Sequence, residues 1–241
     1  MTYSTRTVGF HCELLHPPGP VDAAVVQRVH NRLFQSPEPL YRSFAVTHEG
    51  CTLSNLVARP GAISQASFLV DRFRFHEEGT GLTPGEFADR VVTVSEQVCE
   101  ARGFAMFTGQ VVTLRTLVNP RAYGTSIELL RDGVLGFDEL DAQALGRPLG
   151  GLGLRLVFPP ANGEHSAFAV RVETLANDRR SLFLENQATF PPVAVREGLS
   201  AVSEHIDAAY RFLTGPVLRM LERRDHVASE GESGDRDDGA R

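Results

Sequence analysis

The sequence predicts a single α+β domain, in which a mostly antiparallel sheet of about eight strands carries its helices on one side. Runs in which apolar and polar residues alternate supply the strands, and two strong stripes at helical spacing lie within 83–103 and 195–222. The order strand, helix, three strands, helix occurs twice along the chain. This repetition predicts two related β-α-β-β-β-α units that continue one sheet.

The first strand is predicted over residues 4–15, where Val8, Phe10, Cys12 and Leu14 share one face. The helix that follows is expected to begin at Pro20, because proline suits a first helical position. Its apolar stripe consists of Val25, Val26, Val29 and Leu33, and Pro37 and Pro39 end it.

Three strands are predicted next, over residues 40–48, 51–58 and 65–75. A hairpin-type turn at residues 48–50 joins the first two, and the segment 59–62, which contains Pro60 and Gly61, joins the last two.

The strongest local signal lies at residues 83–87, where Thr83 can cap a helix that has Pro84 in its first position. Glu86 stands three residues after Thr83, which is the spacing of a capping box. Gly103 is expected to end this helix in a left-handed conformation. The apolar stripe of the helix consists of Phe87, Val91, Val94, Val98 and Ala101.

The second half is predicted to start with a strand over 104–118 that ends at Asn119 and Pro120, followed by helical material over 124–145. Strands are then expected over 151–158, 165–175 and 181–189, before a long helix over 195–222. Pro216 lies inside that helix and predicts a kink near Phe212 or a short second helix. The stripe of the long helix consists of Val195, Leu199, Val202, Ile206, Ala209, Leu213, Val217 and Met220.

Residue matches support the duplication. Residues 94–98 (VSEQV) align with 202–206 (VSEHI) at an offset of 108, and 14–17 (LLHP) align with 117–120 (LVNP) at an offset of 103. These matches predict pseudo-repeats 3–103 and 104–224 within one domain, 1–226. The segment 227–241 is acidic and rich in Gly and Ser, and we expect it to be disordered.

Charge and cysteine content bound the function. The formal net charge is -6, and the sequence has no excess of basic residues that could bind a phosphate backbone. We therefore do not expect nucleic acid as a partner. Cys12, Cys51 and Cys99 are odd in number and lack a CxxC spacing, which disfavours a disulfide framework and a zinc ribbon. The N-terminus lacks the pattern of a secretory signal, and no apolar run reaches the roughly 18 residues of a membrane span. We therefore expect a cytoplasmic protein with no membrane partner, metal or cofactor.

Four segments resemble chemical motifs, and a structural interpretation is favoured for each. His11, Cys12 and Glu13 alternate between the faces of a strand and do not converge on one metal ion. The remaining three segments are 76–78, expected in a charged strand-to-helix loop, 204–207, expected on a solvated helix edge, and the glycine-rich 146–153, expected in a loop that enters a strand. With no GxSxG elbow, the sequence leaves enzymatic activity undecided but favours a protein without it.

The sheet face that the helices leave open supplies the candidate binding site. In residues 71–75, Arg72 and Arg74 alternate with Phe73 and Phe75, so the two arginines share one face. The candidate ligand- or partner-binding residues are His11, Glu13, Arg72, Arg74, Arg115, Arg155 and Arg171. Two interpretations stay open: a polar floor for a ligand or partner, or a solvated face with cross-strand Arg–Glu pairs that involve Glu173 and Glu185 and are each worth a few tenths of a kcal/mol.

Three segments resemble a sporadically distributed bacterial family of uncharacterised proteins of about 250 residues. Residues 10–15 (FHCELL) are similar to the family's first strand, 112–119 (VTLRTLVN) to its GLRYINRI-type central strand, and 206–221 (IDAAYRFLTGPVLRML) to its long C-terminal helix. The YIN tripeptide of the central strand is missing after Arg115, and Gly215 and Pro216 interrupt the last motif. The resemblance implies this fold and a bacterial origin, and it transfers no catalytic residue.

Three functional hypotheses follow. The leading one is a non-enzymatic binding or assembly protein that self-associates or docks a protein partner through exposed sheet surface. The second is a small-ligand-binding protein or enzyme, in which arginines line an anion pocket between sheet and helices. The third and weakest is a saddle that binds nucleic acid.

Overall fold

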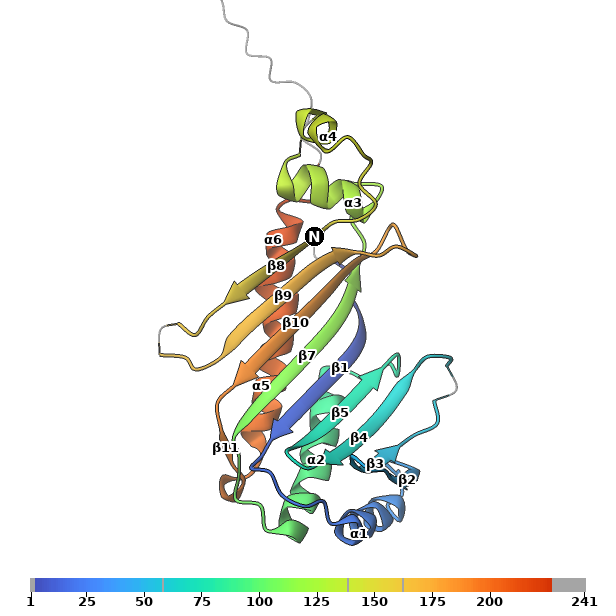
Figure 1. Ribbon diagram of the computed structural model, residues 1–241, viewed down its shortest axis with the longest axis vertical. Coiled ribbons are helices and arrows are strands. Elements are labelled where there is room, and N and C mark those ends of the chain that lie inside the picture. The colour runs from blue at the N-terminus through green and yellow to red at the C-terminus, as the bar shows by residue number, and fades with distance from the viewer. Residues whose placement is uncertain (1–2, 58, 138, 162, 227–241) are drawn as a thin grey trace, which may run out of the picture.

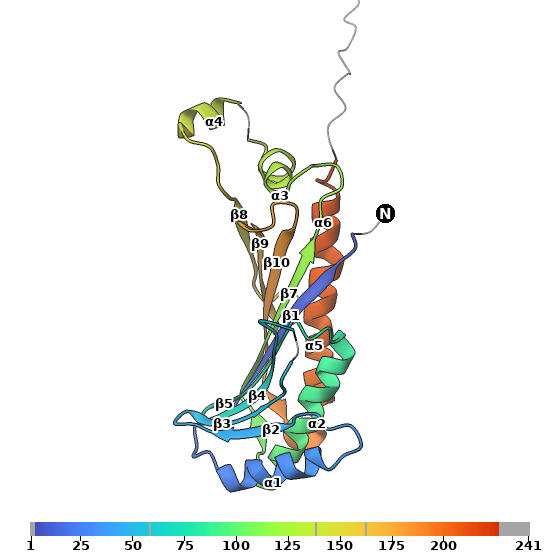
Figure 2. The same cartoon turned by 90° about the vertical axis from the view of Figure 1, so that its right-hand side faces the viewer.

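The computed structural model describes residues 3–57, 59–137, 139–161 and 163–226 and confirms the α+β class. A nine-stranded antiparallel sheet has the order β2-β3-β4-β5-β1-β7-β10-β9-β8, and the long helices lie on one side of it (Figures 1 and 2). The expectation for 227–241 lies outside the described residues.

The first half of the chain has one strand more than the sequence predicts. Its elements are β1 (Arg6–Leu15), α1 (Ala23–Phe34), β2 (Ser43–Val46), β3 (Gly50–Ser54), β4 (Ile63–Leu69), β5 (Arg72–Glu78) and α2 (Pro84–Arg102).

The second half follows the predicted order, with short additions. Its main elements are β7 (Gly109–Val118), the helical segments α3 (Ser126–Glu128), η1 (Leu129–Leu135) and α4 (Glu139–Leu145), the strands β8 (Gly153–Phe158), β9 (Ala167–Thr174) and β10 (Leu182–Phe190), and the final helix α5 (Ser200–Phe212), η3 (Leu213–Val217) and α6 (Leu218–Glu222). The added pieces are β6 (Met106–Phe107), which pairs with β11 (Val193–Ala194), and the turn η2 (Val195–Glu197).

Helix α2 is capped as its sequence predicts. The Thr83 N–H donates to Glu86 Oε2 at 2.7 Å, the Glu86 N–H donates to Thr83 Oγ1 at 3.2 Å, and Gly103 ends the helix at a φ of 69°. Ala101 is exposed, whereas Cys99 is buried, so the stripe ends one turn earlier than predicted.

Helix α1 begins later than predicted. Pro20 lies before the helix, and Asp22 is the capping residue, with its carboxylate accepting from the Val25 N–H at 3.1 Å. An aspartate side chain satisfies an otherwise unpaired N–H of the first turn, which proline cannot do. The predicted stripe is buried, from Val25 to Leu33.

The prediction of one strand over 65–75 is wrong, because β4 and β5 form a hairpin through Val70 and Asp71. Phe68 pairs with Phe73, and both side chains are fully buried. In a continuous strand these two positions would lie on opposite faces, since their separation is odd. The two-residue turn returns both side chains to the core.

The final helix deviates at Pro216, as predicted, but by a π-helical turn. Proline has no N–H for the carbonyl four residues back, and the wider turn accommodates it. The extra residue shifts the buried stripe, so that Leu218 and Leu221 are buried and Met220 is only partly covered. The helix also starts at Ser200 and not at residue 195, because Gly198, at a φ of 85°, separates it from η2.

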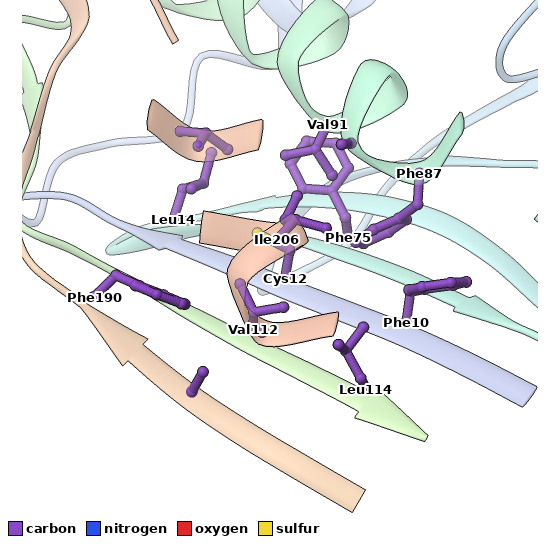
Figure 3. Close-up of a cluster of buried hydrophobic side chains, with 14 of the residues drawn as sticks. Phe10, Cys12, Leu14, Phe75, Phe87, Val91, Val112, Leu114, Phe190 and Ile206 are labelled. Atoms are coloured by element: carbon purple, nitrogen blue, oxygen red, sulfur yellow. The ribbon is translucent and has the colours of Figure 1, made fainter. Parts of the chain in front are cut away.

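The core lies between the sheet and helices α2 and α5 (Figure 3). Phe10 of β1 stacks on Phe87 of α2, with 5.1 Å between ring centroids. Phe75 and Ile206 are fully buried in the same cluster. Burial of each such side chain contributes about 2 kcal/mol, so this layer fixes which face of the sheet the helices cover.

The strand order is approximately symmetric about its centre, apart from the additional edge strand β2. Outward from the central pair β1–β7 lie β5, β4 and β3 on one side and β10, β9 and β8 on the other. Val94 and Val202, aligned at offset 108, are both buried in the paired helices α2 and α5. The strand offset of 103 is wrong, because it matches Leu14, which faces the helices, with Leu117, which faces away. A common origin of the two halves stays a prediction.

Candidate functional site

The predicted residues share the face of the sheet opposite the helices, which we call the open face. Glu77 of β5 bonds to Arg90 of α2, and Gln110 of β7 bonds to α5, so both side chains point toward the helices. Residues an odd number of positions away on the same strand therefore point to the opposite face. By this alternation the open face carries His11, Glu13, Arg72, Arg74, Arg115, Arg155 and Arg171.

One cluster on the open face is centred on Glu13 of β1. Its carboxylate accepts from Arg72 Nη1 at 2.9 Å and from Arg74 Nε at 2.8 Å. Arg72 also bonds to Asp71 at 2.8 Å. His11 Nε2 lies 3.9 Å from Glu13 Oε1, and Glu13 is only 14% exposed. Two guanidiniums are thus neutralised by two carboxylates.

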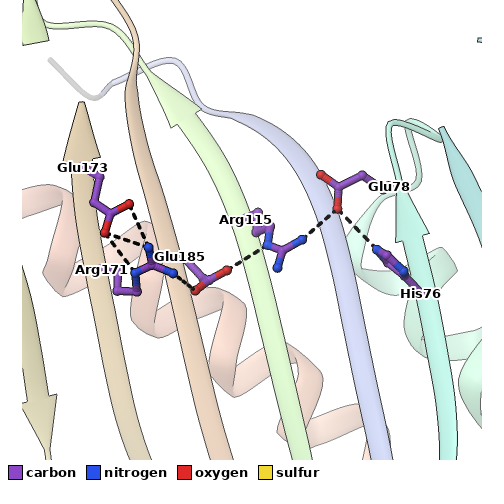
Figure 4. A network of polar contacts seen from close by, with 6 residues as sticks. All are labelled: His76, Glu78, Arg115, Arg171, Glu173 and Glu185. Atoms are coloured by element: carbon purple, nitrogen blue, oxygen red, sulfur yellow. Dashed lines mark hydrogen bonds and ion pairs between the residues drawn. The ribbon is translucent and has the colours of Figure 1, made fainter. Parts of the chain in front are cut away.

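A second group, the charge ladder, crosses five strands from β5 to β9 (Figure 4). Arg115 Nε donates to Glu185 Oε2 at 2.8 Å, and Arg115 Nη1 donates to Glu78 Oε2 at 3.2 Å. Arg171 Nη1 lies 3.2 Å from Glu185 Oε1. The members of the ladder are His76, Glu78, Arg115, Glu185, Arg171 and Glu173. Carboxylates and guanidiniums alternate along it from Glu78 to Glu173, and His76 lies beside Glu78 at its β5 end.

Gly9 makes the charge ladder continuous across β1. Glu78 and Arg115 stand on the strands to either side of β1, and both pair with Gly9 in register. A Cβ at this position would overlap the Glu78 carboxylate. The absence of a side chain therefore lets Glu78 reach over β1 to Arg115.

Arg155 lies apart from both clusters, on β8 and in register with Arg171. The two arginines line a shallow depression of about 530 Å³ together with Glu173, Glu185 and Gln187. Arg72, Arg74 and Arg115 do not line this depression. The arginines proposed for an anion pocket between sheet and helices therefore do not form one, because period-2 alternation directs all of them to the open face.

The electrostatics of the open face fix its charges near neutral pH. Burial lowers the pKa of His11 to about 4, although the Glu13 carboxylate opposes the shift, so His11 is neutral. The hydrogen bond with His76 and the Arg115 charge hold the pKa of Glu78 below its usual value. Carboxylates that stay ionised beside arginines balance the positive charge of this surface. They do not suit proton transfer.

Beneath the sheet lie buried polar groups that the sequence analysis missed. Segment 76–78 is part of β5 and not a loop, and Glu77 points into the core, where Arg90 Nη1 donates to it at 2.5 Å. His205 is not on a solvated edge, because its Nδ1 lies 2.8 Å from Gln110 Oε1 and its ring stacks on Phe190. Glu77 and His205 each occupy a position where the amphipathic pattern calls for an apolar residue. This mismatch in the sequence could have identified them as buried polar groups.

The three cysteines are free and lie in the interior of the protein. Cys12, Cys51 and Cys99 are all buried, and burial raises the pKa of Cys12 and of Cys99 to about 12. Among the described residues, no three His, Cys, Asp or Glu side chains gather as metal ligands would. Within the described ranges, no helix combines the length and the apolar character that a membrane span requires.

No protein-family model matches this chain, and no curated protein matches it either. The resemblance to the sporadically distributed bacterial family stays a prediction.

Proposed function

We propose that this chain is a non-enzymatic assembly protein that binds a second copy of itself by extending its sheet. The observation that carries the proposal is the edge strand β8, which borders the open face and, within the described part of the chain, has no neighbouring strand on its outer side. Val157 on this strand is 64% exposed and Phe158 is 37% exposed. An uncovered edge strand with apolar side chains is a template for pairing with another strand.

The backbone groups available for pairing follow from the ladder with β9. The Thr174 N–H donates to the Leu152 carbonyl, so the alternate residues Leu154, Leu156 and Phe158 bond to β9. The N–H and C=O groups of Gly153, Arg155 and Val157 then point outward. A strand from a second copy would satisfy them.

Charge selects the register of this pairing. If Arg155 paired with its own copy, two like charges would lie directly opposite each other, which is destabilising. A shift of two residues places Arg155 opposite Val157 of the other copy and Leu156 opposite itself. In this register Leu154 faces Phe158 of the other copy, so apolar side chains meet on the helix side of the joined sheets.

The opposite edge fits self-association less well. Strand β2 has four residues against six in β8, so it offers fewer outward backbone groups. An antiparallel pair of identical strands is isologous and closes into a dimer. Because a single strand pair buries little area, we expect a weak, concentration-dependent dimer.

Sedimentation equilibrium of the full chain, from micromolar to near-millimolar concentration, tests the proposal. Val157→Arg places a cation opposite Arg155 twice in the dimer and should weaken association about five- to thirtyfold. Val157→Glu makes the same surface change with the opposite charge and should leave association unchanged or stronger. Val46→Arg on β2 is the matched control and should have no effect.

A wild-type chain that stays monomeric throughout this range would overturn the proposal. So would equal weakening by Val157→Arg and Val157→Glu, because the register requires opposite effects of opposite charges.

The nucleic-acid alternative receives less support. A saddle for nucleic acid needs an excess of positive charge on the binding face. On the open face, Arg72, Arg74, Arg115 and Arg171 each contact a carboxylate within 3.2 Å.

A further inference from the structure

A cleft at the end of the sheet contains arginines that the open face does not use. The residues that line it come from the start of β1, the end of β7 and the β9–β10 turn. These three segments lie side by side at one end of the sheet (Figure 1). Its volume is about 630 Å³, within the usual range for small-molecule sites. The polar residues that line it are Ser4, Arg6, Asn119, Arg121, Asp178, Arg180 and Ser181.

The charge of the cleft differs from that of the open face. Two guanidiniums, from Arg6 and Arg180, line the cleft beside the carboxylate of Asp178. Within the described part of the chain, the Arg6 and Arg180 side chains have no carboxylate within 4 Å. On the open face, by contrast, the ladder arginines Arg115 and Arg171 are each held by carboxylates.

The single carboxylate of the cleft is already engaged. Asp178 Oδ1 accepts from the N–H groups of Arg180 and Ser181, at 3.2 and 3.1 Å. These bonds with Ser181 lower the pKa of Asp178, so it stays ionised and shapes the turn. The remaining positive charge is left for a ligand.

The walls of the cleft are fixed before any ligand binds. Asp225 accepts from the backbone N–H of Arg121 at 2.7 Å and from the Tyr3 hydroxyl at 2.7 Å. The Arg121 guanidinium lies over the Tyr3 ring, 5.4 Å from its centroid. On the other side, Ser181 Oγ donates to Asn119 Oδ1 at 2.9 Å. Walls that are already ordered lower the ordering cost of binding.

We propose that this cleft binds a small molecule through an oxyanion, a phosphate or a carboxylate, held by Arg6 and Arg180. Guanidiniums donate paired hydrogen bonds to both kinds of oxyanion. Leu117, Val118 and Pro120 also line the cleft and can contact an apolar part of the ligand.

The acidic segment 227–241 is a second source of the same chemistry. It carries five carboxylates against two arginines, and it follows His226, whose carbonyl accepts from the Tyr123 hydroxyl at 3.2 Å. The experiment therefore has to distinguish these carboxylates from a free anion.

The test is a titration of the full chain with inorganic phosphate and with citrate at constant ionic strength, followed through the Nε–H resonances of the arginines. We expect saturable shifts at Arg6 and Arg180, and at least about tenfold weaker binding in Arg6→Gln and in Arg180→Gln. Arg28→Gln, an exposed arginine on α1 at the far end of the molecule, is the matched control and should bind as the wild type does.

A second arm repeats the titration in the full chain with Glu230→Gln, Glu232→Gln, Asp235→Asn, Asp237→Asn and Asp238→Asn combined. Binding that appears or tightens only in this variant supports the cleft and identifies the chain's own carboxylates as the competing oxyanion. The absence of saturable shifts in both backgrounds would overturn the proposal, as would binding by Arg6→Gln and by Arg180→Gln that is as tight as that of the wild type.

Discussion

The two halves of the sheet bury polar groups in the same place but by different chemistry. In the first half, Glu77 on β5 forms an ion pair with Arg90 of α2 under the sheet. In the second half, Asn186 on β10 donates from Nδ2 to the Ala209 carbonyl of α5 at 2.9 Å. Both strands flank the central pair β1–β7. Equivalent positions under the sheet therefore hold a charged pair in one half and a neutral amide in the other. The free energy lost on substitution and its dependence on pH should differ between the two.

Removing one member of the charged pair should have the largest effect. Glu77→Gln leaves the Arg90 guanidinium, which is 17% exposed, without its carboxylate, and should lower the free energy of unfolding by about 3 kcal/mol. Asn186→Leu in the second half removes a neutral hydrogen bond and should cost about 1 kcal/mol. Urea denaturation measures both, and equal losses would remove the distinction between the halves.

Glu77 in the first half and His205 in the second should also respond to acid in opposite directions. Burial raises the pKa of Glu77, so its contribution to stability is fully present below pH 4.5, the usual value, and is lost as the pH rises through the folded-state pKa. Burial lowers the pKa of His205, so its contribution is present above pH 6.5 and is lost as the pH falls through the folded-state pKa. His11, with a pKa of about 4, acts in the same direction as His205.

Denaturation between pH 7 and pH 5 separates these contributions. We expect the wild type to lose stability as the pH falls through this range and His205→Gln to lose less. The exposed His48 supplies the control, since His48→Gln should leave the pH dependence unchanged. A His205→Gln variant with the wild-type slope would contradict the assignment.

The smallest expected effect concerns the contact that joins the halves across β1. Gly9→Ala should displace the Glu78 carboxylate from Arg115 and cost about 0.5 kcal/mol, the value of a partly exposed ion pair. Gly109 on β7 has ordinary van der Waals space for a Cβ, so Gly109→Ala is the matched control and should be neutral or stabilising. Equal effects of the two substitutions would show that the ladder is not coupled through position 9.

Local chemistry decided which features the sequence could predict. Thr83, Glu86 and Gly103 specify the ends of α2 by themselves, because capping depends on a few consecutive residues. The hairpin at Val70 and Asp71 has no glycine or asparagine turn signal. Its only sign in the sequence is that the buried residues change from even-numbered positions, such as Phe68, to odd-numbered positions, such as Phe73.

The candidate site shows the same limit. Alternation alone placed the seven predicted residues on one face, but their partners depend on register between strands that are distant in sequence. Glu78 meets Arg115 only because β5 and β7 flank β1 at Gly9. The cleft of Arg6, Arg121 and Arg180 joins three separate segments, and no spacing in the sequence relates them.

The most direct test of assembly through β8 is the hydrogen exchange of the Arg155 and Val157 amides, measured by NMR at two protein concentrations. Pairing with a second copy predicts that both amides exchange more slowly at the higher concentration, while the β2 amides of Ala45 and Val46 exchange at unchanged rates. Exchange at Arg155 and Val157 that is independent of concentration would contradict the account.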